Sequence, residues 1–304
     1  MSEHFDIAVA GGGIAGLSAG LAAARLGRRT LIIAGDVLGG NLLSIEKVEG
    51  YPGFEQGVPG YELCPLTQVQ ASEAGAEFVS VPLQSLEREG AGFRLVTGEG
   101  EYTADAVVIA SGCDMKTLGV PGEDLFKGKG VSHCASCDAP MLRERTVVVV
   151  GGGDSAMQEA LTLAAHVAKV ILLVREETLG GQDSYRQRVT SESRIEVRFG
   201  VEVQEILGSD AVTGVRLKGV LEPLATDAVF AYVGLSPNTA FLNGLVGLDG
   251  DGRISTDGSL AASVQGVFAA GTVRAGSPGR AAASAGDGTT AAIAAHRFLL
   301  KGRA

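Results

Sequence analysis

The sequence predicts an α/β fold made of two similar units, because one pattern of strand, glycines and helix occurs twice along the chain. In residues 5–16 an apolar run leads into Gly11-Gly12-Gly13 and then into a helical apolar pattern. In residues 146–156 four valines lead into Gly151-Gly152-Gly153 in the same way. The recurrence of this pattern in the second half of the chain indicates an internal duplication.

The composition agrees with a folded chain of two domains. The chain has 304 residues, of which 45% are apolar, and this is enough for two hydrophobic cores. The formal charge of −10 argues against nucleic acid and acidic membrane surfaces as partners. The start of the chain has no basic segment ahead of an apolar run, and no apolar stretch has the length of a membrane span. We therefore expect a cytoplasmic protein.

The first unit begins as a strand over 5–10, a helix over 14–26 and a strand over 29–33. In the connecting turn, Gly11 permits a tight bend, Gly13 lets the main chain approach a pyrophosphate, and Gly16 lets the helix pack closely on the strand. The phosphates of a nucleotide would then lie over the helix N-terminus. Further elements are expected as a helix at about 60–75 and strands near 77–81, 93–96 and 106–110.

The strand near 106–110 runs into small residues, Ala110-Ser111-Gly112, which leave room for a flat ligand beside the main chain. An ordinary buried strand that reaches a turn would show the same residues. The segment 267–272 repeats this feature before an alanine-rich helix at about 279–299.

The second unit begins with a strand over 146–150, a helix over about 154–167 and a strand over 169–174, followed by strands near 195–204, 212–218 and 228–233. We expect two Rossmann-like three-layer dinucleotide-binding domains, the second inserted into the first. The first domain would be discontinuous, 1–116 with 246–304, and the second would be 117–245. The crossings near 120–123 and 243–244 would act as hinges.

Cys134 and Cys137 are separated by two residues and followed at once by Asp138, which is the pattern of a thiol–disulfide exchange unit. A zinc site is the alternative, but it needs about four ligands, and Cys64 and Cys113 have no cysteine or histidine close by in the sequence. We therefore expect no metal, and we interpret Cys64 and Cys113 as small buried residues. His133 is a candidate for tuning the dithiol, and the alternative is an exposed loop histidine.

Together these motifs resemble the low-molecular-weight thioredoxin reductases, from residue 5 to about residue 300. Beyond the two glycine turns and the Cys134–Asp138 unit, the resemblance includes Gly39-Gly40-Asn41, Tyr51-Pro52-Gly53-Phe54, residues 118–123, residues 233–239 and residues 266–271. It implies FAD in the outer domain, NADPH in the inserted domain and a homodimer. It also implies that the inserted domain rotates, so that the flavin meets either the nicotinamide or the dithiol.

Residue by residue, the resemblance makes Cys137 the thiol that faces the flavin, Cys134 the thiol that reacts with the partner disulfide, and Asp138 the acid that supplies protons to the leaving thiolate. The positions that would bind FAD are Gly11, Gly13, Ile14, Ala15, Gly16, Gly40, Asn41, Ala110, Gly112, Gly271, Thr272, Arg280 and Ala281. The positions that would bind a nicotinamide nucleotide are Gly151, Gly153, Asp154, Ser155, Arg175 and Glu176.

The chain departs from the family at two places. Thr272 stands where the family usually has an aspartate on the ribityl chain of the flavin, and its hydroxyl still donates or accepts a hydrogen bond. After the second strand of the inserted domain, the family has His-Arg-Arg and a further Arg for the 2′-phosphate of NADPH, whereas here only Arg175 remains, with Glu176 beside it and Gly180 at the further position. Glu176 would repel a 2′-phosphate, or it is a solvated charge after a strand.

Three interpretations of the electron source follow from these departures. The first is a nicotinamide-dependent reductase that prefers NADH, or binds NADPH through Arg175 with help from Arg186 or Arg188. The second is a disulfide reductase fed by ferredoxin or another flavoprotein. The third is a flavin dithiol oxidase that makes disulfides and passes electrons to oxygen.

The partner would be a thioredoxin-like protein or a small dithiol or disulfide. A protein of another class, a flavin-bearing sensor or interaction module without turnover, is disfavoured because such a binder has little need of an intact dithiol. A ferredoxin–NADP reductase of the same fold group is disfavoured because those proteins lack the cysteine pair.

Overall fold

The structure, a computed structural model, describes residues 3–302. The chain forms two compact units: unit 1 consists of Met1–Asp114 and Ser236–Ala304, and unit 2 is Met115–Leu235. The second unit is thus inserted into the first in sequence. The two connecting segments, β7 (Cys113–Met115) and β16 (Leu235–Pro237), pair with each other as a two-stranded ribbon.

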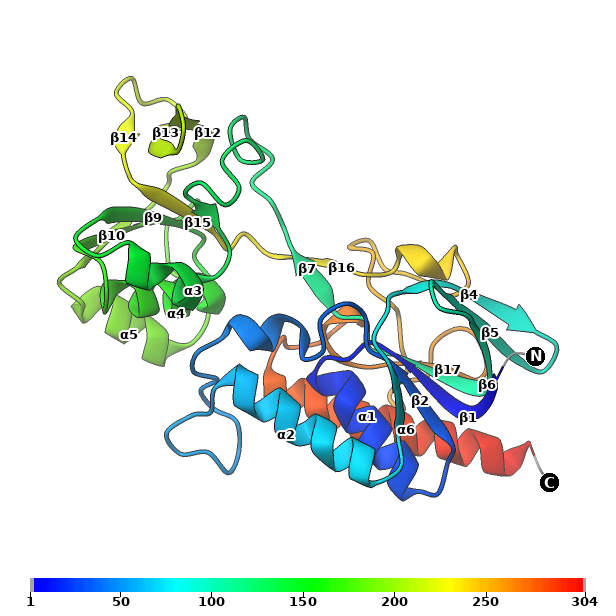
Figure 1. The fold of residues 1–304 in the computed structure, drawn as a ribbon. Helices are drawn as coiled ribbons and strands as arrows, with labels where there is room; N and C mark the ends of the chain where they lie inside the picture. Colours follow the sequence, from blue (N-terminus) through cyan, green and yellow to red (C-terminus); the bar gives the residue numbers. More distant parts are fainter. Residues whose placement is uncertain (1–2, 303–304) are drawn as a thin grey trace. The chain divides into compact units, whose positions relative to one another are not determined.

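Unit 1 is built on one sheet with the strand order β3-β2-β1-β6-β5-β4 (Figure 1). The parallel part consists of β1 (Glu3–Ala10), β2 (Thr30–Ile33), β3 (Glu77–Val79) and β6 (Glu101–Ile109), with β17 (Val267–Ala269) parallel to the end of β6. The antiparallel part consists of β5 (Gly92–Thr97) and β4 (Leu83–Glu89). β1 is central, and most of its residues from Phe5 onward are buried, which explains its nearly continuous apolar sequence.

Three helices cover one face of this sheet: α1 (Ile14–Arg25), α2 (Gly60–Glu73) and α6 (Ala281–Lys301) (Figure 1). Unit 1 also contains three short 3₁₀ helices: η1 (Gly40–Ser44), η3 (Ala240–Leu242) and η4 (Gly271–Val273). Within residues 3–302 no helix has both the length and the apolar character needed to cross a membrane.

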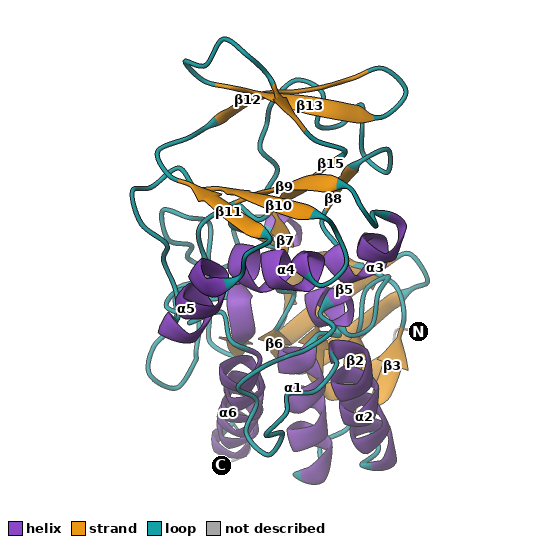
Figure 2. Cartoon of the chain, turned by 90° about the vertical axis from the view of Figure 1, so that its left-hand side faces the viewer, coloured by secondary structure: helices purple, strands orange, loops and turns teal. Residues whose placement is uncertain are grey.

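Unit 2 has three layers (Figure 2). Its central sheet is parallel and has the order β11-β10-β9-β15-β8, formed by β8 (Val131–Ser132), β9 (Thr146–Val150), β10 (Lys169–Leu173), β11 (Ile195–Arg198) and β15 (Ala228–Ala231). On one face lie α3 (Ala135–Asp138), which continues as η2 (Ala139–Met141), α4 (Asp154–Ala164) and α5 (Asp183–Ser191). On the other lies a small antiparallel sheet of β12 (Val203–Gly208), β13 (Val212–Leu217) and β14 (Leu224–Ala225). A separate hydrophobic cluster fills the space on each side of the central sheet.

The boundaries between the units differ from the expected 116/117 and 245/246. The chain returns to unit 1 at Ser236 because Leu242 and Val246 are buried in the same cluster as Leu86 and Ile254 of that unit. The expected hinge at 120–123 lies inside unit 2, where the Ile206 N–H donates to the Pro121 carbonyl.

Several elements differ from the sequence prediction, among them β4, where no strand was expected. The single strand expected over 195–204 is two strands in two sheets, β11 and β12, because Gly200 turns the chain between them with a φ of +66°. Helix α5 was not predicted, since its sequence is polar and only Tyr185 and Val189 are buried. That single pair of apolar residues at helical spacing is too short a pattern to identify a helix.

The contact between α1 and α6 depends on a glycine at residue 288. A Cβ atom there would lie 2.0 Å from the Ala15 carbonyl oxygen, whereas a Cβ atom at Gly286 would meet no atom of the described residues within 4 Å. We predict that Gly288→Ala lowers the free energy of unfolding by about 3 kcal/mol, because the main chains of α1 and α6 must move apart to make room for the methyl group. Gly286→Ala, on the same helix, raises it by up to about 1 kcal/mol through helix propensity. Urea unfolding of the two variants measures the difference, and equal stability would contradict this packing.

Candidate active site

The N-terminus of α1 forms the centre of the site in unit 1. Its first turn contains Ile14, Ala15 and Gly16, with no acid and no side-chain cap, and the first main-chain N–H groups of a helix have no acceptor within it. Gly13 is the N-cap, and a Cβ atom there would meet no atom within 4 Å in the described part of the chain. Gly16, by contrast, is needed for packing, since its Cβ would lie 1.9 Å from the Gly11 carbonyl oxygen. The space in front of α1 therefore fits the phosphates of a dinucleotide.

Two other segments reach this helix end. The Gly39 N–H donates to the Gly12 carbonyl at 2.8 Å, which brings Gly40 and Asn41 beside the first glycine turn. The Asn41 amide then donates to the Cys113 carbonyl at 2.7 Å. This bond joins the 39–41 segment to the first residue of β7. Just after β6, the Ala110 carbonyl oxygen lies 2.2 Å from the position that a Cβ atom of Gly11 would occupy.

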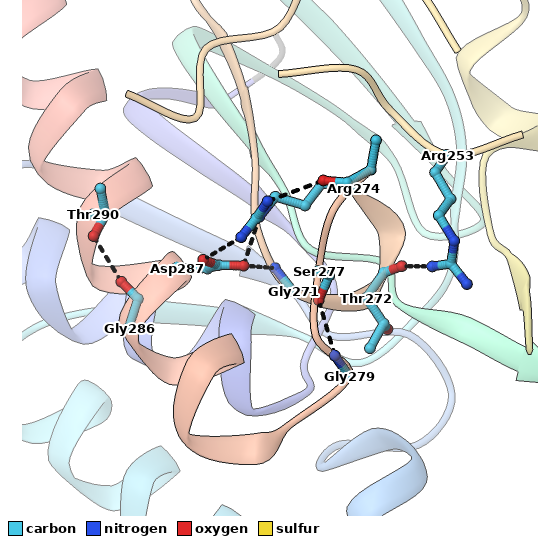
Figure 3. Close-up of polar contacts among 10 residues, drawn as sticks. Arg253, Gly271, Thr272, Arg274, Ser277, Gly279, Gly286, Asp287 and Thr290 are labelled. Carbon is cyan, nitrogen blue, oxygen red and sulfur yellow. Dashed lines mark hydrogen bonds and ion pairs between the residues drawn. The ribbon is translucent and has the colours of Figure 1, made fainter. Parts of the chain in front are cut away.

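A third segment, the Gly271–Thr272 turn, is held from α6 (Figure 3). Asp287 accepts the Gly271 N–H at 3.1 Å and forms two hydrogen bonds with the Arg274 guanidinium, at 2.7 and 2.9 Å. The Arg274 and Asp287 side chains are only 15% and 12% exposed. This nearly buried ion pair fixes the turn to the helix, because both groups are paired through several hydrogen bonds.

The Thr272 carbonyl is fixed by two further donors. Arg253 donates to it (Figure 3). The Cys113 thiol also donates to it, at 3.2 Å. The Arg253 guanidinium also donates to the Cys113 sulfur at 3.4 Å. The Thr272 hydroxyl lies 3.8 Å from the position that a Cβ atom of Gly112 would occupy, so the two residues are neighbours in the site.

The structure thus brings most of the expected FAD positions together within unit 1. Ala281, at the start of α6, packs against the hydrophobic cluster that contains Ile14. Arg280 is the N-cap of α6 and is exposed there. Sequence reasoning missed Asp287, Arg274 and Arg253. The flanking glycines of Asp287 were a signal, since an acid between Gly286 and Gly288 is unusual inside a helix.

The second glycine turn, in unit 2, has the same shape but different chemistry. Gly153 is the N-cap of α4, and Asp154 and Ser155 begin the helix. The Asp154 carboxylate accepts the Gln182 N–H at 2.8 Å, which ties the segment before α5 to the turn. An acid therefore lies at the helix end where unit 1 has only apolar residues and glycine.

Arg175 and Glu176 follow β10 and are both exposed. The Arg175 guanidinium donates to the Glu176 carboxylate at 3.0 and 3.3 Å. A hydrogen bond from its own main-chain amide, together with Arg175, holds the pKa of Glu176 below its usual value. Glu176 therefore carries its negative charge at neutral pH, and the remaining arginine of the motif is already paired.

Cys134 and Cys137 form a disulfide, with 5.3 Å between their Cα atoms. Cys134 is the N-cap of α3, and its N–H donates to the Ser132 hydroxyl at 3.1 Å. Cys137 lies in α3 and is exposed, and Asp138 follows it, half-buried. Among residues 3–302, no group of three or more His, Cys, Asp or Glu side chains is arranged to hold a metal ion, and Cys64 and Cys113 are free and buried.

His133 is not an exposed loop residue. Its ring is half-buried, and Nδ1 lies 3.0 Å from the Ala231 carbonyl oxygen. A carbonyl only accepts, so Nδ1 is the protonated nitrogen. The ring fastens the dithiol segment to the end of β15.

The family model of the pyridine nucleotide-disulphide oxidoreductases matches residues 5–288, and the chain belongs to this family. A thioredoxin reductase from Treponema pallidum is 37% identical over 303 residues, which is 98% of each chain. The crystal structure of Lactococcus lactis thioredoxin reductase has a TM-score of 0.94 and 31% identity, over 98% of this chain and 99% of that one. These comparisons confirm the predicted fold of two dinucleotide-binding domains.

Within the family, the chain is one of the low-molecular-weight thioredoxin reductase-like flavoproteins, and it is an FAD-dependent disulfide oxidoreductase. The resemblance inferred from its motifs is confirmed. A further solved structure, a ferredoxin–flavin thioredoxin reductase from Clostridium acetobutylicum, is 28% identical with a TM-score of 0.55, over 99% of this chain and 100% of that one.

We predict that Asp287→Asn lowers the free energy of unfolding by about 2–4 kcal/mol, because it leaves the Arg274 charge nearly buried without its partner. It also weakens FAD binding roughly tenfold, since the Gly271–Thr272 turn is released. Thermal unfolding and equilibrium flavin titration measure the two effects. Glu87→Gln, which breaks an exposed pair with Arg94 in the same unit, is the control and costs less than about 1 kcal/mol. Equal effects of the two variants would contradict a structural role for the Asp287 pair.

Proposed function

We propose that this chain reduces a disulfide of thioredoxin, or of a similar partner, through the dithiol of Cys134 and Cys137. The observation that carries the proposal is the Cys134–Cys137 disulfide at the start of α3, in a unit inserted into a domain whose glycine segments fit FAD. FAD bound there and reduced by the electron donor would supply the two electrons that reduce this disulfide, and would itself return to the oxidised form. The FAD positions would be those gathered at α1, at Asn41, at Gly112 and at the Gly271–Thr272 turn.

The exchange uses both sulfurs in order. The Cys134 thiolate attacks a sulfur of the partner disulfide, so that a mixed disulfide forms and one partner thiolate leaves. The Cys137 thiolate then attacks the Cys134 sulfur, the internal disulfide forms again, and the second partner thiolate leaves. The partner is reduced by two electrons and the dithiol of this chain is oxidised by two.

Asp138 would supply protons to the leaving thiolates. It lies in the same short helix as Cys137 and is half-buried, so its proton is near the sulfurs but still exchanges with solvent. The fixed His133 ring supports a structural role for that residue, because its Nδ1 proton is already used on the Ala231 carbonyl.

For the electron donor we propose a nicotinamide nucleotide with NADH preferred over NADPH. Gly151 and Gly153 form a usable turn at the start of α4, but Glu176 is charged and pairs with Arg175, which leaves little positive charge for a 2′-phosphate. A ferredoxin or another protein donor is the second candidate. It is supported by the loss of all the motif's arginines except Arg175, and by the likeness to the Clostridium acetobutylicum enzyme. A dithiol oxidase is the third, and rapid oxygen consumption with a dithiol as sole reductant would favour it.

We predict that Cys137→Ser leaves the flavin reducible but abolishes turnover with a disulfide partner, because the mixed disulfide at Cys134 cannot be resolved. Anaerobic flavin reduction and steady-state reduction of thioredoxin measure the two steps. The control is Cys64→Ala: burial raises the pKa of Cys64 to about 11, so it remains a thiol at neutral pH and takes no part. Full turnover by Cys137→Ser would remove the exchange mechanism.

We predict that NADH bleaches the flavin of the oxidised protein at lower concentration than NADPH under anaerobic conditions. Glu176→Gln should narrow this preference by a few-fold, because it removes an exposed charge near the 2′ position. Stopped-flow absorbance with NADPH, NADH and reduced ferredoxin in turn makes the comparison. Rapid bleaching by NADPH at low concentration would overturn the proposed preference, and bleaching by ferredoxin alone would establish the second donor.

A further inference from the structure

The motif at 233–239 takes no part in the exchange chemistry, but its last residues lie at the edge of the proposed flavin site. β16 ends at Pro237, and Asn238 follows it where the chain has returned to unit 1. β16 pairs with β7, which begins at Cys113, directly after the expected FAD position Gly112 (Figure 1). The ribbon between the two units therefore begins and ends beside this site.

The outgoing segment, 111–114, is held at Cys113 by residues of the flavin site. The Asn41 amide donates to the Cys113 carbonyl at 2.7 Å, and the Cys113 thiol donates to the Thr272 carbonyl at 3.2 Å. Gly112 turns the chain just before this point, with a φ of +67°. Because Asn41 and Thr272 are both expected FAD positions, this side of the segment depends on the residues that would hold the cofactor.

Asn238 binds the same segment through four hydrogen bonds. Its N–H donates to the Gly112 carbonyl at 3.0 Å, and its carbonyl accepts the Ser111 hydroxyl at 2.7 Å. Its side-chain amide donates to the Ser111 carbonyl at 3.3 Å and to the Asp114 carboxylate at 3.1 Å. A carbonyl and a carboxylate only accept, so the side chain must offer two N–H donors from one nitrogen. Aspartate, serine and threonine cannot do this.

We propose that Asn238 is a positioning residue that fixes the Ser111–Gly112 edge of the flavin site and ties this edge to β16. It acts through the main chain of residues 111 and 112 rather than on the reacting atoms. Since Asn41, Thr272 and Asn238 all hold one short segment, FAD binding stabilises the ribbon, and the ribbon in turn strengthens FAD binding. This role rests on the proposed function in placing FAD beside Gly112 and Thr272.

The first test compares two variants that each lose side-chain hydrogen bonds in unit 1. Asn238→Ala removes the two bonds of the side-chain amide. Its matched control is Ser263→Ala, because the Ser263 hydroxyl accepts the Gly247 N–H at 2.8 Å. The readout is the release of FAD from the holoenzyme after dilution, followed by flavin fluorescence. Asn238→Ala should release FAD about fivefold faster, the effect of one hydrogen bond, and Ser263→Ala should release it at the rate of the unaltered chain.

A second pair of variants separates positioning from general stability. Asn238→Asp removes both donors and places a second carboxylate beside Asp114, so FAD should leave faster than from Asn238→Ala. Adding Asp114→Asn restores one hydrogen bond with its donor on the opposite side, and this should slow the release at least about twofold. A defect of fold stability alone would lower the temperature of thermal unfolding without producing this order of release rates.

Hydrogen exchange tests the coupling without turnover. In the unaltered chain, loading with FAD should slow main-chain exchange both in 111–114 and in 235–238. In Asn238→Ala the protection should remain in 111–114 and fall in 235–238, because half of the bonds between the two segments are lost. Ser111→Ala, which removes the bond to the Asn238 carbonyl, is the second variant if Asn238→Ala does not fold.

Unchanged FAD release from Asn238→Ala would overturn the proposed role. So would equal protection of 235–238 by FAD in that variant and in the unaltered chain. Thr272→Val then identifies the cause, since normal release from this variant as well would mean that the proposed FAD position is wrong. Failure of the proposed exchange is separate and appears as full turnover by Cys137→Ser, which leaves the results on FAD release standing.

Discussion

The position of α1 in unit 1 depends on two contacts in which a glycine lies directly against a main-chain carbonyl. Gly16 lies against the Gly11 carbonyl and Gly288 lies against the Ala15 carbonyl, each at a distance that no side chain would allow. Because α1 is pressed from both sides, its N-terminus is held in one place while the 39–41 segment, the end of β6 and the Gly271–Thr272 turn come to it. A site for an extended cofactor needs such fixed pieces, since each holds a different part of the ligand.

The sequence predicted those features of the site that are local. The glycine turns and the cysteine pair each lie within a few consecutive residues, so their spacing alone carries the chemistry. The Arg274–Asp287 pair and the bond from Arg253 to the Thr272 carbonyl join residues that only the tertiary fold brings together. The boundary at Ser236 was missed for a similar reason. Leu242 is buried among strands from the first part of the chain, and the sequence around it does not indicate this contact.

The two glycine turns have the same strand–turn–helix backbone, but the charges at their helix N-termini differ. In unit 1 the first helical turn has no acid, and the positive end of the α1 dipole is open to phosphate. In unit 2 Asp154 lies at the same place and its carboxylate is already bound to the Gln182 N–H. Farther along, Glu176 neutralises Arg175. Nucleotide recognition in unit 2 would therefore rest on the main chain more than on charge.

The dithiol segment depends on its surroundings because α3 has only four residues. So short a helix has little dipole with which to tune a thiol, and its first N–H groups need partners from elsewhere. Ser132 supports Cys134 from before the helix, His133 fastens the segment to β15, and Tyr232 packs beneath it. The position of the dithiol segment consequently depends on the end of β15. A change at the end of β15 would therefore disturb the sulfurs through their support, although neither cysteine lies on that strand.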